Sequence, residues 1–354
     1  MKKNEADISV NLNNKIVLKN PFILGAFELT GDLTGLEMAH RSSAGKFGAI
    51  VIKTTTIKKR SGYSEPKVAN FGDGYLVASG MKNPGIKAVC GNIRIFKKLH
   101  PEQVLFLSIA PINPKSVIKD LVYLARAAAK AGVDAVELNL SCPHSDQKEK
   151  FDTCIIAQNP ALVRRIVSQL KAQLADFPRL ALIPKLSGWN CDLTAVALAA
   201  EQGGADAVVI SNIFPGTGFF TGINKINNNH HYQIGQHLVG NEKGGFTGKA
   251  LHSAVLLMVE DVKRQIKIPI IATGGCATDS DSIIQTFFAG ASAIETVTPF
   301  YFESDHYKSF DKKISGYLKD LSVYMKKNGL NDLDSFYHLA HRSFWQGFRI
   351  WRKK

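Results

Sequence analysis

The chain has 354 residues, 45% of them hydrophobic, and its 44 Lys and Arg against 30 Asp and Glu give a formal net charge of +14. This amount of apolar material excludes a disordered chain, and the length fits either two domains or one large α/β barrel. The 5 cysteines are scattered and form no CxxC pair, which excludes a disulfide framework and a zinc ribbon.

The sequence indicates neither a membrane span nor a nucleic-acid-binding protein. The longest uncharged stretch near the middle, residues 207–224, contains Asn212, Pro215 and several glycines, which are costly in hydrocarbon. The polar N-terminus lacks the apolar run of a secretory signal, so we expect a cytoplasmic protein. The positive charge accompanies no motif that reads nucleic acid, and we interpret it as solvated surface that attracts small anions.

Eight short runs of β-branched and apolar residues predict β-strands. They are continuously hydrophobic rather than alternating, which is typical of parallel strands covered on both faces. The runs span residues 22–26, 47–54, 104–110, 134–140, 180–186, 206–212, 268–273 and 290–298. Helical patterns lie between strands, at residues 33–44, 114–131, 160–174, 193–202, 250–265 and 279–289. Strand and helix therefore alternate along the chain.

An internal repeat supports this alternation. Variants of one motif, a glycine followed by a short apolar run, occur at residues 44–51, 131–136, 203–208 and 289–294. We call it the glycine motif. Each variant ends a helix at glycine and then begins a buried strand. We therefore predict a closed (β/α)8 barrel, or TIM barrel, as a single domain over residues 1–340, with an open doubly wound sheet as the alternative.

Two connections are too long to be simple loops. They follow the second and the sixth predicted strands, at residues 55–103 and 213–248. Long ordered loops after barrel strands usually build the active site. We expect no metal site in this chain, because Cys142, His144 and Cys154 lack a fourth ligand at suitable spacing.

Polar residues interrupt the C-terminal ends of the predicted strands, which converge on one face of a barrel. Lys53 and Lys185 each follow an apolar run, where an unpaired ammonium group is costly. We expect both to meet an anionic or strongly hydrogen-bonding ligand, and extension of the side chain to water is the alternative. The other residues of this kind are Asn139, Ser141, Cys142, Ser211, Asn212, Gly274, Gly275 and Thr298.

Two glycine-rich segments are candidate phosphate sites. One precedes a predicted helix at residues 244–248, and the other follows the seventh strand at residues 272–275. Glycine allows close approach of the backbone, and amides at a helix start suit an anion. The first segment is not a Walker A loop, because Lys243 and Ala250 occupy its required Gly and Ser/Thr positions. Both segments fall where phosphate loops recur in barrels.

Cys142 is the candidate nucleophilic or basic residue after the fourth strand. A thiol accepts protons when its surroundings favour the thiolate, whereas a buried thiol is a small hydrophobe. The residues alone leave both interpretations open.

Motifs from four parts of the chain resemble the flavin-dependent dihydroorotate dehydrogenases and the pyrimidine-binding domain of dihydropyrimidine dehydrogenase. They are NLSCPH at 139–144, IATGG at 271–275, GGFTGKAL at 244–251 and VIKTTTIKKRSGYSEPK at 51–67. The similarity spans about residues 20–337. It implies an FMN-binding barrel that oxidises a dihydropyrimidine, or reduces the pyrimidine, across the C5–C6 bond.

The resemblance also implies roles for individual residues. Cys142 and Lys53 are the expected catalytic residues, with Cys142 taking the C5 proton while C6 delivers hydride to flavin N5. Lys185 resembles a second flavin-contacting lysine, and Asn139 and Asn212 resemble amides that hold both flavin and substrate. The further flavin contacts that it implies are Ala26, Gly245, Gly274, Gly275 and Thr298.

Three departures from the family pattern concern the substrate. His144 replaces the usual Asn of the soluble class, Ile213 replaces a Ser or Thr, and Val77 replaces an Asn. We predict dihydroorotate as the substrate, with another dihydropyrimidine such as dihydrouracil, or a catalytically idle flavin or pyrimidine binder, as alternatives. The expected substrate contacts are Ser79, Gly80, Met81, Asn139, His144 and Asn212.

The C-terminal tail, residues 341–354, is basic and aromatic. Phe344, Trp345, Phe348 and Trp351 recur at helical spacing. We expect this face to dock on the barrel or on a second copy, and contact with a membrane surface is the alternative. The family resemblance further implies a homodimer. The electron acceptor is left open among fumarate, a quinone and NAD reached through a partner subunit.

Overall fold

The computed structural model describes residues 6–141, 154–221, 233–301 and 309–341. Its centre is a closed barrel in which every neighbouring pair of strands is parallel. Each of the eight predicted runs coincides with one barrel strand, and the second strand extends one residue beyond its run. The strands are β3 (Phe22–Leu24), β4 (Ala49–Thr55), β7 (Leu105–Ile109), β8 (Ala135–Asn139), β9 (Ala181–Leu186), β10 (Val208–Ile210), β13 (Ile270–Thr273) and β14 (Ala293–Thr296). Because β14 pairs with β3, with Ile294 opposite Phe22, the open sheet is excluded.

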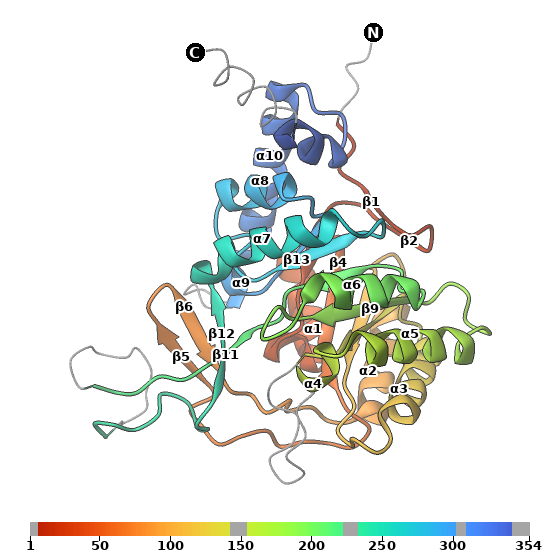
Figure 1. The fold of residues 1–354 in the computed structure, drawn as a ribbon, viewed down its shortest axis with the longest axis vertical. Helices are drawn as coiled ribbons and strands as arrows, with labels where there is room; N and C mark the ends of the chain where they lie inside the picture. Colours follow the sequence, from red (N-terminus) through yellow and green to blue (C-terminus); the bar gives the residue numbers. More distant parts are fainter. Residues whose placement is uncertain (1–5, 142–153, 222–232, 302–308, 342–354) are drawn as a thin grey trace.

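Helices surround the barrel (Figure 1). They are α1 (Leu33–Ser42), α2 (Ile86–Leu99), α3 (Val117–Ala131), α5 (Pro160–Gln173), α6 (Leu193–Gln202), α7 (His252–Lys263), α8 (Ser280–Phe288) and α10 (Phe310–Asn328). Six of these were predicted, and α2 and α10 were not. Helix α2 buries Val89, Ile93 and Phe96 at helical spacing, but its N-cap Gly85 offers no capping side chain, so the usual start signal is missing.

The glycine motif lies at the ends of helices, as predicted. Gly132 ends α3 in the left-handed conformation, with φ of 102°, and its N–H donates to the carbonyls of Ala128 and Ala129. In two copies of the glycine motif, an aspartate after the glycine accepts a hydrogen bond from the preceding barrel strand. Asp134 Oδ2 accepts from the Leu105 N–H at 2.8 Å, and Asp206 Oδ2 accepts from the Leu182 N–H at 2.8 Å. These hydrogen bonds hold the start of one barrel strand next to the start of its neighbour.

The two long connections meet in a small second sheet at one end of the barrel (Figure 1). The first supplies β5 (Val68–Phe71) and β6 (Gly74–Val77), and the second supplies β11 (Phe214–Gly216) and β12 (Gly244–Gly248). The order is β11-β12-β6-β5. The first glycine-rich segment thus forms a strand, and the 3-10 turn η2 (Lys249–Leu251) separates it from α7.

The opposite end of the barrel carries the hairpin of β1 (Val10–Leu12) and β2 (Ile16–Leu18). Lys15, in its turn, donates to the Leu180 carbonyl just before β9. The remaining short elements are η1 (Glu28–Gly31), α4 (Cys154–Ala157) and α9 (Thr298–Tyr301). Over the described ranges, none of the helices combines the length and the apolar character that a membrane span requires.

Candidate active site

A cavity lies at the C-terminal ends of the barrel strands, beneath the small sheet. The space between its lining atoms, with the open mouth included, is about 1260 Å³. Its wall includes most of the described residues that the sequence singled out: Ala26, Lys53, Ser79, Met81, Asn139, Lys185, Ser211, Asn212, Gly274, Gly275 and Thr298. Gly80 and Gly245 do not line it. Cys142, His144 and the tail from residue 342 fall outside the described residues.

A hydrogen-bonded chain of amides and hydroxyls crosses the cavity wall. Asn139 Nδ2 donates to Thr54 Oγ1, and Asn139 Oδ1 accepts from Asn212 Nδ2, both at 3.0 Å. Asn212 Nδ2 also donates to Ser141 Oγ at 3.0 Å, and its Oδ1 accepts from the Ile213 N–H at 2.8 Å. These partners fix the orientation of both amides, which present donors and acceptors together, as the edge of a pyrimidine requires.

Lys53 lies next to this chain and is paired with a carboxylate. Its Nζ is 2.8 Å from Glu28 Oε1, and the side chains are 10% and 34% exposed. Glu28 belongs to η1, the turn that follows the first barrel strand. The anionic partner that the sequence led us to expect for Lys53 is therefore provided, at least in part, by the protein itself.

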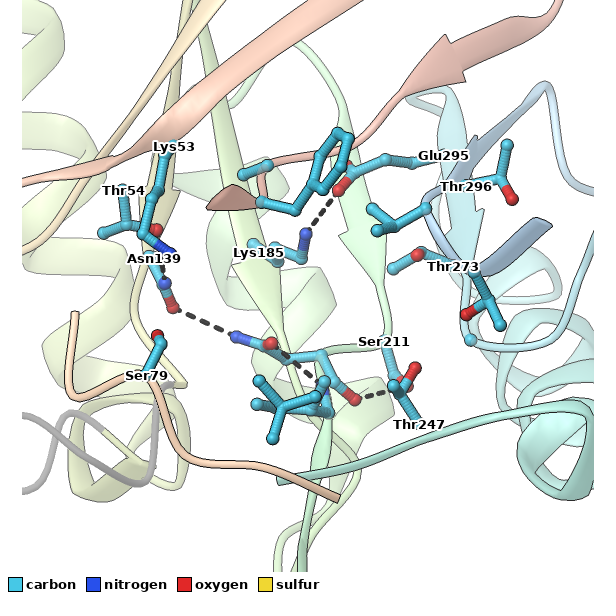
Figure 2. A pocket seen from close by; sticks show the side chains of 18 of the residues that line it. Lys53, Thr54, Ser79, Asn139, Lys185, Ser211, Thr247, Thr273, Glu295 and Thr296 are labelled. Atoms are coloured by element: carbon cyan, nitrogen blue, oxygen red, sulfur yellow. Dashed lines mark hydrogen bonds and ion pairs between the residues drawn. The ribbon is translucent and has the colours of Figure 1, made fainter. Parts of the chain in front are cut away.

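Lys185 lies deeper, between two buried carboxylates. Its Nζ is 2.5 Å from Glu295 Oε1 and 3.5 Å from Glu137 Oε2. Figure 2 shows the pair of Lys185 and Glu295, with Lys53, Thr54 and Asn139 on one side of Lys185 and Thr273 and Thr296 on the other. Burial acts to lower the pKa of Lys185, but the two carboxylates outweigh it and raise that pKa above its ordinary value. Lys185 is therefore a permanent cation.

Glu137 is the unusual member of this group. It is 1% exposed, and neither of its carboxyl oxygens has a hydrogen-bond partner among the described residues. Burial, reinforced by the negative charge of Glu295, raises the pKa of Glu137 to about 8. This shift favours the neutral, protonated form of the carboxyl.

The far wall of the cavity is built from glycines after β13. Gly274 and Gly275 have φ of 109° and 76°, and a Cβ on Gly275 would lie 2.6 Å from the Gly248 carbonyl oxygen. Only glycine fits this conformation and this contact. Gly245 has a different role, because a Cβ there would lie 2.0 Å from Ile213 Cδ1, so it makes room for that side chain.

Sequence reasoning missed the three glutamates of the site, Glu28, Glu137 and Glu295. One signal was available for Glu137: it lies two residues before Asn139 in a strand, so both side chains point to the same face. No local signal identified Glu28 or Glu295, whose lysine partners lie on other strands.

Comparisons with known proteins agree with this geometry. The family model described as dihydroorotate dehydrogenase matches residues 9–319. A protein of Methanocella arvoryzae named dihydroorotate dehydrogenase B (NAD(+)), catalytic subunit, is 31% identical, covering 92% of this chain and 96% of that protein. A dihydroorotate dehydrogenase A (fumarate) of Lactiplantibacillus plantarum is 29% identical, covering 83% and 88%.

The fold is also found among solved structures. A crystal structure of DHODH from Eimeria tenella in complex with ferulenol superposes with a TM-score of 0.74 at 18% identity, covering 97% of this chain and 90% of that one. The family model matches most of the sequence, and a relative is 31% identical over nearly its whole length. The chain therefore belongs to the dihydroorotate dehydrogenase family.

Proposed function

We propose that this protein oxidises dihydroorotate to orotate and that FMN is its redox cofactor. The resemblance of its motifs to the flavin-dependent dihydroorotate dehydrogenases supports the cofactor. When bound, the flavin supplies the two-electron acceptor that amino-acid side chains lack. The observation that carries the proposal is the cavity itself, where a fixed pair of amides, two lysines and a glycine-built wall line one space.

The described residues fit the cofactor. The glycines at 274 and 275 and Thr298 suit a phosphate, because glycine brings the backbone to the wall of the cavity. Lys53 and Lys185 suit the pyrimidine edge of the ring system, where a cation stabilises negative charge. Ala26, two residues after the first barrel strand, lines the same cavity with a small side chain.

Substrate binding falls to the amide pair and to the segment after β6. Asn139 and Asn212 are held in fixed orientations, so they bind a pyrimidine ring without a loss of side-chain freedom. Ser79 and Met81 line the cavity on the same side and leave backbone amides for a carboxylate. These contacts position the ring for loss of the C5 proton.

Cys142 is the proposed base for that proton. It directly follows Ser141, whose Oγ donates to the Lys185 carbonyl at 3.0 Å and is therefore fixed at the edge of the cavity. The assignment of Cys142 rests on this neighbour and on the family resemblance.

Replacing the thiol tests the assignment. Cys142→Ala is expected to bind the flavin normally and to slow its reduction by dihydroorotate at least about 100-fold, the usual contribution of a positioned base. Cys191→Ala is the matched control, because Cys191 is half-buried, contacts the Ser187 carbonyl and does not line the cavity. Stopped-flow absorbance measures both variants, and a Cys142 variant that reduces at the wild-type rate refutes the role.

A second substrate is favoured by two apolar residues of the wall. Val77 and Ile213 line the cavity where the family pattern has hydrogen-bonding side chains. Fewer such partners favour a substrate with fewer polar groups, such as dihydrouracil. Flavin reduction measured with dihydrouracil and dihydroorotate side by side decides between them.

The acceptor and the assembly are part of the proposal. Relatives named as catalytic subunits of NAD-dependent enzymes support a partner subunit that passes electrons on, and the fumarate-type relative supports direct reoxidation. Reoxidation by fumarate, by a quinone and by NAD with a partner subunit distinguishes these routes. The homodimer stays a prediction that light scattering tests.

A further inference from the structure

The described lining of the cavity has more acidic than basic side chains. Two lysines, Lys53 and Lys185, face three glutamates, Glu28, Glu137 and Glu295, and the other described residues of the wall are uncharged. The lysines come from β4 and β9, and the glutamates come from η1, β8 and β14. With every group ionised, the cavity would hold one uncompensated negative charge.

That charge is concentrated at Glu137. The ammonium of Lys185 is 2.5 Å from Glu295 but 3.5 Å from Glu137, so it is engaged chiefly by Glu295. Over the part of the chain that the structure describes, neither carboxyl oxygen of Glu137 has a hydrogen-bond partner, and the residue is 1% exposed. An ionised carboxylate in such a place carries the full cost of burial, whereas a neutral acid does not.

We propose that Glu137 holds a proton that keeps the Glu137–Lys185–Glu295 group neutral, and that this proton would favour reduction of a flavin bound in the cavity. Glu137 acts as an electrostatic positioning residue. No bond to carbon or to the flavin is made or broken at Glu137. The proton stays on the carboxyl at neutral pH and passes to solvent when the pH rises past about 8.

The proposal rests on flavin binding as set out above, and it adds a pH dependence that the hydride chemistry does not require. Reduction places negative charge on the flavin ring, and a second negative charge on Glu137 repels it. Loss of the proton therefore shifts the bound flavin toward its oxidised state. At matched electrode potential, the ratio of reduced to oxidised flavin falls more steeply with pH once Glu137 ionises.

The first test follows the proton directly and needs no flavin. In flavin-free wild-type protein, infrared difference spectra between pH 7 and pH 9.5 are expected to show loss of the carbonyl band of a protonated carboxyl group. Glu137→Gln is expected to lack this titrating band. Glu295→Gln is expected to lack it too, because Glu137 then ionises as the sole partner of Lys185. A band that persists in Glu137→Gln overturns the proposal.

The second test measures the potential of the bound flavin between pH 6.5 and pH 9.5. Glu137→Gln copies the neutral acid, so the ratio of reduced to oxidised flavin should differ from wild type by less than about twofold at pH 6.5. At pH 9.5 the variant should be at least about tenfold more reduced, which is about 30 mV for a two-electron couple. Parallel pH profiles for the two proteins refute the coupling.

Glu28→Gln is the matched control for charge alone. Glu28 is 34% exposed and pairs with Lys53, so its removal should shift the potential by a similar amount at every pH. Failure of the proposed function has a different signature. If the flavin binds but dihydroorotate does not reduce it, the infrared band and the pH profile still decide the role of Glu137.

Discussion

The two ends of the barrel bury charge in different ways. At the N-terminal end, Asp206 is 1% exposed, yet its Oδ2 accepts from the Leu182 N–H and from Lys171 Nζ, both at 2.8 Å, and Lys15 lies 3.5 Å away. At the C-terminal end, Glu137 is equally buried and lies 3.5 Å from Lys185, but its oxygens have no hydrogen-bond partner among the described residues. The hydrogen-bonded Asp206 stabilises the fold. The buried Glu137 destabilises the fold when it is ionised, and it lies at the site where ligands bind.

The largest effect is expected from removing the cation of the C-terminal end. Lys185→Met leaves the buried carboxylate of Glu295 without its counter-charge, which should lower the free energy of unfolding by about 3–5 kcal/mol and impair flavin retention. Chemical denaturation and flavin release measure the two consequences. Lys46→Met, which removes an exposed ion pair with Asp311, should have a much smaller effect. Equal losses in the two variants would contradict the contrast between buried and exposed pairs.

A smaller effect is expected at the N-terminal end. Asp206→Ala leaves the buried Leu182 N–H without an acceptor and Lys171 without its partner, and should cost about 3 kcal/mol of unfolding free energy. Because Asp206 lies at the end of the barrel away from the cavity, the rate of flavin reduction in the folded variant should stay within about twofold of wild type. Denaturation and stopped-flow kinetics measure both, and a large kinetic defect would show that the two ends are not separable.

The third prediction concerns the pH dependence of stability. The pKa of Glu137 is raised from 4.5 to about 8 in the folded protein, so the unfolded chain loses this proton first as the pH rises. The contribution of Glu137 to the free energy of unfolding therefore falls between about pH 4.5 and pH 8 and is constant above.

Glu137→Gln removes that contribution. Between pH 6 and pH 8 the wild type should lose about 2 kcal/mol relative to the variant. Unfolding curves at the two pH values measure the difference. An unchanged difference would mean that Glu137 is already ionised at pH 6.

The barrel could be predicted from the sequence because its signals are local. In the sequence, buried parallel strands are short apolar runs, and the glycine motif indicates where helices end. Helix α2 was missed because Gly85, with φ of 86°, precedes it without a capping side chain. The small sheet was missed because β6 pairs with β12, about 170 residues further along, and no local pattern indicates such a pairing.

The candidate site was predicted in part for the same reason. Lys53, Asn139, Lys185 and Asn212 end their strands, and the barrel topology alone brings such residues to one rim. The partners of the lysines depend on contacts between distant strands. Glu295 meets Lys185 across 110 positions of sequence, so only the folded chain brings them together.

The most direct measurement of the central claim is an anaerobic titration of the purified, flavin-loaded protein with dihydroorotate. The account predicts that the flavin absorbance is bleached in proportion to the dihydroorotate added, with one orotate formed for each flavin reduced. A flavin that dithionite bleaches but that stays oxidised at saturating dihydroorotate would contradict it.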